Sequence, residues 1–464
     1  MTKLNTPARS ITMEENIVHS FLPWKNDQKI FFRILFLFFL IMSIPWNGFW
    51  YKNIASITWN TLEYRHLHVF CEFTPKFVEI NSESGHWGIE SYVNWALILA
   101  VSVIGGLLWT VLDKQRAEYN TLYYWLRTLV RYRAGVGVLG YGFTKLFPTQ
   151  MPYPSLSILN TDFINLTPQK VFWLSVGSVP WYECYTGFIE LLAGVLLLFR
   201  PTALYGGILL FAALGDIVFV NFVYDGEVHL FSTYLCLYGL FVLAHDVPKL
   251  YNLLIRERFT VPVNFHPKFS SGWQTFRVVV KSGTLLIFIG LFSYLMYQNF
   301  RYDPYKLPHN KGLANTAGYY HITEFRVNNK IIPYSPVDSV RWEDAVFEKW
   351  STFTFKVNRP VKIDISGGGG RPKKEIDRRF EMAGVAGGRR FFTYRTDTLA
   401  KVLYLQNKNI PDTTQRLVFH YAKPSPSRII LSGLDENQDS LYVILDKADR
   451  KYLLPESTLQ AGSY

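Results

Sequence analysis

The sequence predicts an α-helical membrane bundle of about seven transmembrane helices, followed by a C-terminal all-β domain. The bundle is predicted because 49% of the 464 residues are hydrophobic and because several segments before residue 300 hold the roughly 20 largely apolar residues that cross a bilayer. The β-domain is predicted because, after Gly318, short runs rich in β-branched and aromatic residues are broken by turn residues. A chain of this length accommodates two or three domains.

Seven candidate spans follow one another along the first 300 residues. They occupy residues 30–50, 92–112, 122–147, 179–199, 203–222, 228–244 and 278–297. No small-residue cleavage site follows the first span, so we expect a signal anchor behind a polar tail, residues 1–29. Arg200-Pro201 provides a natural end for the fourth span, and the third span is the most polar of the seven.

The distribution of basic residues predicts the orientation of these spans. The tail and residues 113–121 and 245–277 are rich in Lys and Arg, whereas residues 51–91, 148–178 and 223–227 are poor in them for their length. By the positive-inside rule, the N-terminus is cytoplasmic. An odd number of spans then places residues 301–464 on the outer side. If the charged third span did not cross the membrane, that domain would lie on the cytoplasmic side instead.

The C-terminal domain begins with a hairpin signal, Asn328-Asn329, between strand-like residues 319–327 and 330–334. Further strand-like runs are residues 352–357, 361–366, 390–394, 401–405, 416–421, 428–431 and 440–445. They predict a small antiparallel sandwich or barrel. The glycines at 367–370 and the basic residues after them lack the ending of a phosphate-binding loop, which favours a mobile basic loop.

Composition excludes several classes of function. None of the three cysteines, Cys71, Cys184 and Cys236, belongs to a CxxC pair, so neither a zinc site nor a thioredoxin-type motif is indicated. Cys71 and Cys184 both fall on the predicted outer side, and whether they pair stays open. His66 and His68 would share one face of a strand and could bind a metal, but an amphipathic surface segment is favoured. The net charge of +12 is spread over loops and the C-terminal domain, and no nucleic-acid-binding module is recognisable. We therefore expect no nucleic-acid partner.

Charged residues at membrane depth point to chemistry between residues 120 and 246. A charge inside a bilayer is costly, so it usually marks a pathway, a ligand site or a buried ion pair. The third span carries Arg131, Arg133 and Lys145, the fourth Glu183 and Glu190, the fifth Asp216 and the sixth His229.

Converting span position into depth at 1.5 Å per residue separates these groups into two layers. Arg133 or Arg131 and Glu190 are expected to lie near the midplane, where adjacent antiparallel spans would let them form a buried ion pair. This pair either serves bundle packing alone or takes part in function. The outer layer forms a polar cup of Lys145, Glu183, Asp216 and His229, with Tyr141 and Tyr185 as hydrogen-bond donors. Carboxylates beside a lysine or histidine suit proton transfer or contact with a quinone.

Two runs in this region resemble the DoxX-like membrane family. They are Arg133-Ala134-Gly135-Val136-Gly137, continuing to Lys145-Leu146, and Gly187-Phe188-Ile189-Glu190-Leu191-Leu192-Ala193-Gly194. The resemblance implies a four-helix membrane core over residues 120–246, with Arg133, Lys145 and Glu190 at positions of the family pattern. Some members are linked to quinone-coupled thiosulfate oxidation and others to thiol-redox partners, and no agreed catalytic set exists.

Further stretches look like the larger members of this family from Bacteroidetes, namely Asn221-Phe222-Val223-Tyr224-Asp225, Leu230-Phe231-Ser232 and the hairpin of residues 318–327 with Arg341-Trp342. In those members a further span and an extracytoplasmic β-rich domain follow the core. The expected organisation is therefore a cytoplasmic tail (1–29), two spans with an outer loop (30–119), the four-helix core (120–246), a basic cytoplasmic loop with the seventh span (247–300), and a periplasmic β-domain (301–464). The resemblance implies the inner membrane of a bacterium.

Two functions follow from these expectations, and catalytic residues stay unassigned. The first is a redox-linked membrane protein that binds a quinone or a small sulfur or thiol compound in the outward-facing cup. The second is a non-enzymatic envelope assembly protein, whose β-domain binds a protein partner. A likeness to vitamin K-dependent carboxylases rests on architecture alone, because their histidine-rich motif is absent.

Overall fold

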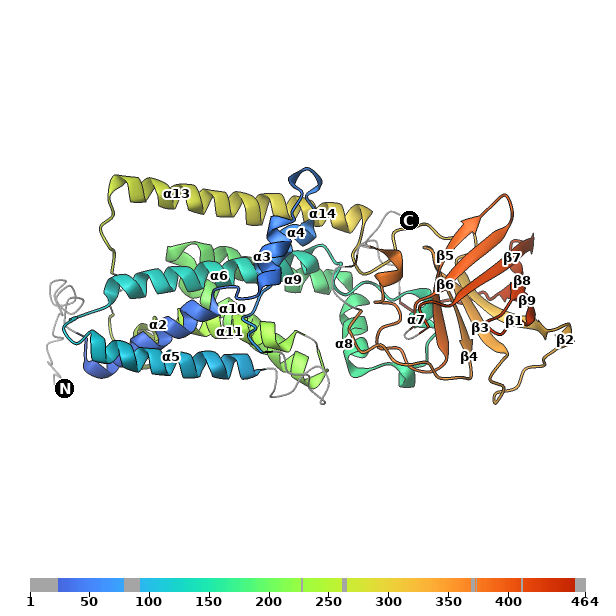
Figure 1. Cartoon of the computed structure of the whole chain (residues 1–464), viewed down its shortest axis with the longest axis horizontal. Coiled ribbons are helices and arrows are strands. Elements are labelled where there is room, and N and C mark those ends of the chain that lie inside the picture. The colour runs from blue at the N-terminus through green and yellow to red at the C-terminus, as the bar shows by residue number, and fades with distance from the viewer. Residues whose placement is uncertain are drawn as a thin grey trace, which may run out of the picture.

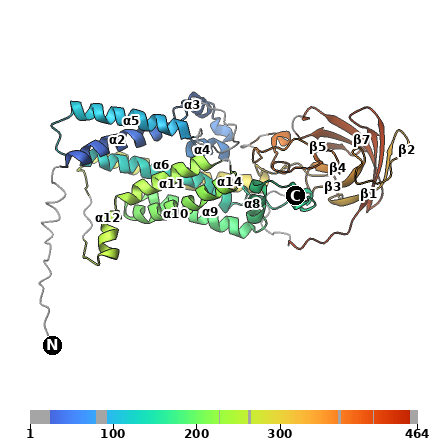
Figure 2. The ribbon, with the colours of Figure 1, turned by 90° about the horizontal axis from the view of Figure 1, so that it is seen from below.

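The computed structural model describes residues 24–78, 92–226, 228–260, 265–368, 372, 374–409 and 412–454. A bundle of long helices forms one end of an elongated molecule, and an antiparallel β-barrel forms the other (Figure 1). The helix connections rich in basic residues lie at the end of the bundle farthest from the barrel (Figures 1 and 2). The architecture therefore separates the basic loops from the β-domain, as the charge distribution predicts.

The long helices of the bundle run alongside one another (Figure 1). They are α2 (Asn26–Met42), α5 (Val93–Leu112), α6 (Asn120–Leu146), α9 (Pro180–Leu198), α10 (Ala203–Val223), α11 (His229–Ala244) and the continuous helix made by α13 (Ser271–Leu285), η6 (Leu286–Leu291) and α14 (Phe292–Tyr302). The predicted stop at Arg200-Pro201 is confirmed, because α9 ends at Leu198 and a short 3-10 turn, η4 (Arg200–Thr202), follows.

Four of the described helices are long and apolar enough to cross a membrane, namely α5, α9, α10 with its preceding turn, and the α13–α14 helix. These are the second, fourth, fifth and seventh predicted spans. A fifth exists if α11 and the segment after it, Val247–Ile255, form one span bent by 56°. That segment comprises α12 (Val247–Leu250) and the π-helix η5 (Tyr251–Ile255).

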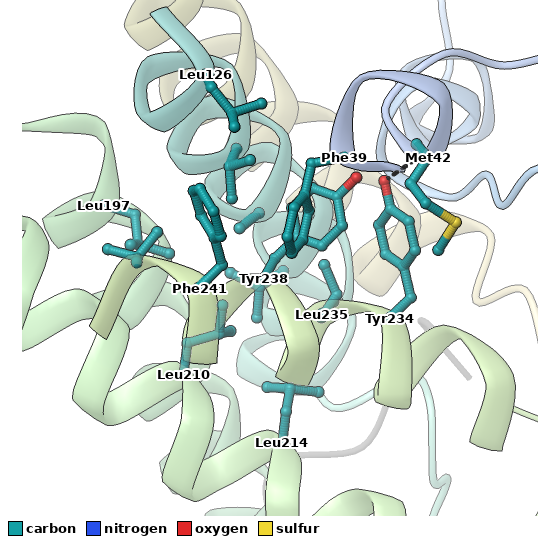
Figure 3. Close-up of a cluster of buried hydrophobic side chains, with 14 of the residues drawn as sticks. Phe39, Met42, Leu126, Leu197, Leu210, Leu214, Tyr234, Leu235, Tyr238 and Phe241 are labelled. Carbon is teal, nitrogen blue, oxygen red and sulfur yellow. Dashed lines mark hydrogen bonds between the residues drawn. The ribbon is translucent and has the colours of Figure 1, made fainter. Parts of the chain in front are cut away.

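Aromatic side chains from distant parts of the chain fill the core between α2, α6, α10 and α11 (Figure 3). Phe39 of α2 packs against Tyr238 and Phe241 of α11, with ring centroids 5.3 and 4.3 Å apart. The buried Tyr234 hydroxyl donates to the Met42 carbonyl at 3.0 Å, as Figure 3 shows. Burial of a tyrosine is tolerated when its hydroxyl finds such a partner, so these contacts hold the end of α2 against the core.

The connection between α2 and α5 is more structured than the expected outer loop. It contains α3 (Gly48–Ala55), the turn η1 (Trp59–Thr61) and α4 (Tyr64–Cys71), and α4 packs against α6 and α14. His66 and His68 lie on this helix rather than on a strand, so they do not share one face as the metal-site alternative required. The segment after α4 is drawn into the bundle, because Arg133 binds its backbone carbonyls.

The C-terminal domain is an eight-stranded barrel, which decides between the two predicted β-architectures. Antiparallel neighbours follow the order β1-β3-β4-β5-β6-β7-β8-β9, and pairing of β1 with β9 closes the ring, while β2 extends β1 as a short hairpin. The strands are β1 (Gly318–Val327), β2 (Lys330–Ile331), β3 (Trp342–Phe347), β4 (Thr352–Val357), β5 (Arg389–Asp397), β6 (Val402–Asn407), β7 (Arg416–Ser425), β8 (Arg428–Leu434) and β9 (Ser440–Lys447).

Two strand predictions were wrong. Residues 361–366 form no strand but a loop, in which the Val361 amide donates to the Gly387 carbonyl at 2.9 Å and the Asp364 carbonyl accepts from the Gly384 amide at 2.7 Å. Strand β3 was missed, because its residues are buried almost throughout and a register shift between Trp342 and Asp344 interrupts the alternation.

Glycines bring α6 and α9 into close contact. A methyl group on Gly187 would overlap the backbone nitrogen of Leu146 and lie 2.7 Å from the Gly142 oxygen. A methyl group on Gly142 would lie 2.8 Å from the Leu191 side chain. Small residues allow helix backbones to approach in this way, so the two glycines set the spacing and the register of the pair.

We expect Gly187→Ala to destabilise the protein by about 1–3 kcal/mol, because overpacking forces backbone shifts. Gly215→Ala is the matched control: Gly215 lies inside α10 with open space around it, so alanine there should be neutral or stabilise the helix by up to about 1 kcal/mol. The measurement is the thermal unfolding midpoint of both variants in one detergent. Equal midpoints would contradict the close approach.

Candidate functional site

A cavity of about 350 Å³, including its open mouth, lies between α6, α9, α10 and α11. One part of its lining is polar and contains Tyr141, Lys145, Gln150, Glu190 and Ser232. The remaining lining is apolar and contains Val138, Leu214, Ile217, Val228, Phe231 and Leu235. A concave site with apolar walls and a few convergent polar groups is the usual form of a small-molecule site.

Lys145 and Glu190 form a buried ion pair in this cavity. The Lys145 ammonium donates to Glu190 Oε1, and the two side chains are only 9% and 3% exposed. The second oxygen, Glu190 Oε2, is buried and has no hydrogen-bond partner within the part of the chain that the structure describes. An ion pair inside a protein needs further hydrogen bonds to offset its desolvation, and this pair lacks one of them.

The predicted pairing of Glu190 with Arg133 or Arg131 was wrong. Gly187 packs at the level of Gly142 and Leu146, so Glu190 lies near Tyr141 along α6. Arg133 is eight residues further along, or about 12 Å away. Counting residues from the predicted span ends placed the two helices in an incorrect register, because those ends do not mark equal depths.

Arg133 is satisfied by a different set of groups. Its Nη1 donates to the Cys71 carbonyl at 2.9 Å and its Nη2 to the Phe73 carbonyl at 2.7 Å. The guanidinium also lies 3.7 Å from the centre of the Phe73 ring and 5.0 Å from that of Tyr234. Such contacts stabilise a cation away from water. Arg131 is buried and forms no ion pair with a carboxylate of the described residues.

A polar group that sequence reasoning missed adjoins the cavity. The Tyr141 hydroxyl donates to Glu72 Oε1 at 2.7 Å, and Glu72 Oε2 lies 3.6 Å from His68 Nδ1. The His68 and Tyr141 rings meet edge to face, with centroids 5.3 Å apart. The four-residue spacing of His68 and Glu72 is a helical signal that could have revealed this group, but the segment was interpreted as an amphipathic surface segment.

The other predicted members of the cup do not line this cavity. Glu183 is buried and accepts from the backbone amides of Gln150 and Met151 at 3.1 and 3.0 Å, which closes the turn after α6. His229 is buried between the rings of Tyr92 and Phe222. Asp216 and Tyr185 point away from the bundle and are exposed. The cup is therefore narrower than predicted, with Tyr141 and Lys145 retained and Glu190 added.

The cysteines are not paired, and the potential metal ligands among the described residues do not cluster. Cys184 is a free thiol that donates to the Leu146 carbonyl at 3.3 Å, so it is not bonded to Cys71, and Cys236 is also a free thiol. Within the described ranges, no three His, Cys, Asp or Glu side chains are grouped as ligands for a metal ion.

A second set of buried charges joins the barrel to the connection between α6 and α9. This connection contains α7 (Leu156–Leu159), the turn η3 (Phe163–Asn165) and α8 (Pro168–Gly177). Glu348, at the end of β3, accepts from the Ser157 amide and hydroxyl at 2.7 and 2.6 Å. Arg389 of β5 donates to both Asp344 oxygens, at 2.9 and 3.0 Å, and to the Asn160 carbonyl at 2.9 Å.

Two groups at this junction have pKa values far from their ordinary ones. Burial, reinforced by the nearby Glu381 carboxylate, raises the pKa of Glu348 from 4.5 to about 7. Burial lowers the pKa of Lys170 from 10.5 to about 7, although Glu381 and Asp364 oppose the shift. Lys170 is held by the Phe380 carbonyl and lies over the Phe380 ring. The junction therefore has a pH-dependent stability.

Comparisons with known proteins identify no family for this chain. No protein-family model matches the chain, and no curated protein or solved structure matches it. The fold defines a helical protein with several membrane-length apolar helices and a docked β-barrel.

We expect Lys145→Met and Glu190→Gln each to destabilise the bundle by about 3–5 kcal/mol, because each leaves a buried charge without its partner. The double variant should lose less than the sum of the two, since no unpaired charge is left. The measurement is a double-mutant cycle of unfolding free energies in detergent. Additive losses would contradict the pairing.

We expect the free energy of unfolding to fall by roughly 3 kcal/mol as the pH rises from 4.5 to about 7. The folded state binds the Glu348 proton more tightly than the unfolded chain, so its stabilising effect is complete below pH 4.5 and is lost as the pH rises through 7. Lys170 contributes little slope in this window, because its shift acts between pH 7 and 10.5.

Glu348→Gln should abolish this part of the pH dependence, as measured by urea unfolding at several pH values. The difference between variant and wild type isolates the one carboxyl group from all others. An unchanged slope in the variant would show that Glu348 titrates normally.

Proposed function

We propose that this chain is a DoxX-like integral membrane protein whose bundle cavity binds a small redox-active molecule, either a quinone or a small sulfur or thiol compound. The observation that carries the proposal is the buried Lys145–Glu190 pair in the wall of an otherwise apolar cavity. A quinone has a hydrogen-bonding head and an apolar body, and the two parts of the lining match these two requirements.

The polar groups of the cavity suit the two states of a quinone. Lys145 and Gln150 carry donors for the carbonyl oxygens of the oxidised head. Glu190 Oε2, which has no hydrogen-bond partner among the described residues, would accept a proton or a hydrogen bond from the hydroxyl of the reduced head. The same oxygen would accept from a thiol, so the geometry supports both ligand classes.

We further propose that all seven predicted helices cross the membrane. Charges or short length exclude α2 and α6 from an assignment by composition, but Arg33, Arg133 and Lys145 on these helices have partners within the protein. Arg33 of α2 donates to the Tyr119 hydroxyl at 2.9 Å and to the Asp113 carbonyl at 2.7 Å. Paired charges are tolerated inside bundles.

The proposed location is the inner membrane of a bacterium, with the N-terminus in the cytoplasm and the barrel in the periplasm. The separation of basic loops from the barrel supports this orientation. A second candidate function is envelope assembly, in which residues 301–464 bind a protein partner. It is supported by the docking of the barrel on the connection between α6 and α9 through buried hydrogen bonds of Glu348 and Arg389. Recovery of only the single chain after mild solubilisation would count against that alternative.

We expect the wild-type protein in lipid nanodiscs to bind menadione, a soluble quinone, and to retain native quinone on purification. Lys145→Met and Glu190→Gln should each weaken binding at least roughly tenfold, the effect of losing one charge-assisted hydrogen bond. Tyr185→Phe is the control, because that exposed residue of α9 lies outside the cavity.

Binding is measured by calorimetry against empty nanodiscs, and native quinone by solvent extraction and mass spectrometry. Absence of both in the wild type, or equal affinity in all four proteins, would reject a quinone. A thiol probe such as cysteamine then tests the remaining ligand class.

A further inference from the structure

The barrel contains a cavity of its own at the ends of its strands. It encloses about 550 Å³ including its open mouth, and buried apolar side chains form its floor, namely Phe325, Trp342, Phe355, Leu417, Phe419 and Leu441. Trp342 and Phe355 stack with ring centroids 3.9 Å apart and an interplanar angle of 8°. The floor therefore offers a flat aromatic surface for an apolar body.

Two arginines line this cavity, Arg359 and Arg390, and Arg359 is paired with Glu436 at the mouth. Arg390 is paired in register with Phe355, whose side chain faces the barrel interior, so Arg390 also points inward. Only 6% of Arg390 is exposed. Its one ion-pair contact within the described residues is with Asp412 at 4.0 Å, the limit for such a contact, and that carboxylate is half exposed. Burial lowers the pKa of Arg390.

Glu436 attracts the Arg390 charge from a distance, but the carboxylates at the mouth form their hydrogen bonds with other groups. Glu436 pairs with Arg359 and accepts from Gln415 at 2.5 Å. Asp435 accepts from the backbone amides of Asn437 and Asp439 at 2.8 and 2.9 Å. The buried guanidinium thus keeps donors directed at the cavity.

The preceding residue on the same strand has a larger set of partners. Arg389 points outward, binds both oxygens of Asp344 and also donates to Thr354 and to the Asn160 carbonyl. A buried arginine usually has such a set of partners. Arg390 lacks them, although it is almost equally buried.

We infer that the barrel cavity binds a small organic anion, with its acidic head on Arg390 and its aromatic or short aliphatic body against Trp342, Phe355 and Phe419. A carboxylate matches the fork of donors on a guanidinium, and such charge-assisted bonds are strong when shielded from water. This site is separate from the bundle cavity and does not depend on the proposed redox function.

The test uses 3-phenylpropionate as the anionic probe and phenethylamine as its cationic counterpart, titrated by calorimetry into the full chain in nanodiscs. The wild type should bind phenylpropionate and not phenethylamine. Arg390→Gln should weaken phenylpropionate binding at least roughly tenfold. Arg395→Gln, an exposed arginine further along β5, should leave the binding unchanged.

Val340→Trp provides a second variant, since Arg390→Gln replaces a buried residue and could impair folding. Val340 is 52% exposed at the mouth of the cavity, so tryptophan there should block entry while Arg390 stays in place. Loss of phenylpropionate binding in Val340→Trp and retention in Arg395→Gln, with unchanged thermal midpoints, supports the site. No binding by the wild type, equal binding of the two probes, or binding unaffected by Arg390→Gln and Val340→Trp would overturn it.

Discussion

The close approach of α6 and α9 is the constraint on which the rest of the structure depends. Gly187 lies against the backbone of Leu146, and Gly142 lies against Leu191. This spacing allows the Lys145 ammonium to reach Glu190 inside the bundle. It also allows Glu183 to accept from the amides of Gln150 and Met151, so the chain turns sharply as it leaves α6. Larger residues at either glycine would separate the helices and disturb the ion pair and the turn together.

That turn determines where the barrel sits. The connection between α6 and α9 covers the outer surface of β3, β4 and β5, where Ile158 packs with Phe391 and Met382, and where Glu348 and Arg389 bind its backbone. Bundle and barrel are thus joined by a buried interface with its own hydrogen bonds from charged side chains. Strand β5 has a double role, because Arg389 faces the interface and Arg390 faces the barrel cavity.

Much of the fold was predictable because its signals are local. Uninterrupted apolar runs identified α5, α9, α10 and the α13–α14 helix, and period-two runs identified most strands. Closure of the barrel was not predictable, because it depends on pairing of β1 with β9 across more than a hundred residues. The site was predictable only in part: Lys145, Tyr141 and Glu190 were recognised as polar groups at depth, but their register depends on Gly187. Glu72 and Arg390 were missed, because their surroundings come from distant segments.

Charge at depth alone does not distinguish structural from functional residues in this chain, whereas unmet hydrogen-bonding capacity beside a cavity does. Arg133 and Arg389 are buried cations that each donate to several acceptors, although the Nε of each has no partner among the described residues, and holding chain segments in place accounts for them. A buried ion pair contributes little net stability compared with apolar residues of similar volume, so packing alone gives no reason for Lys145 and Glu190. Glu190 leaves one oxygen without a hydrogen bond from any described residue, and Arg390 keeps a single distant contact among them. Both line open space, and a ligand that supplies the missing groups would account for both.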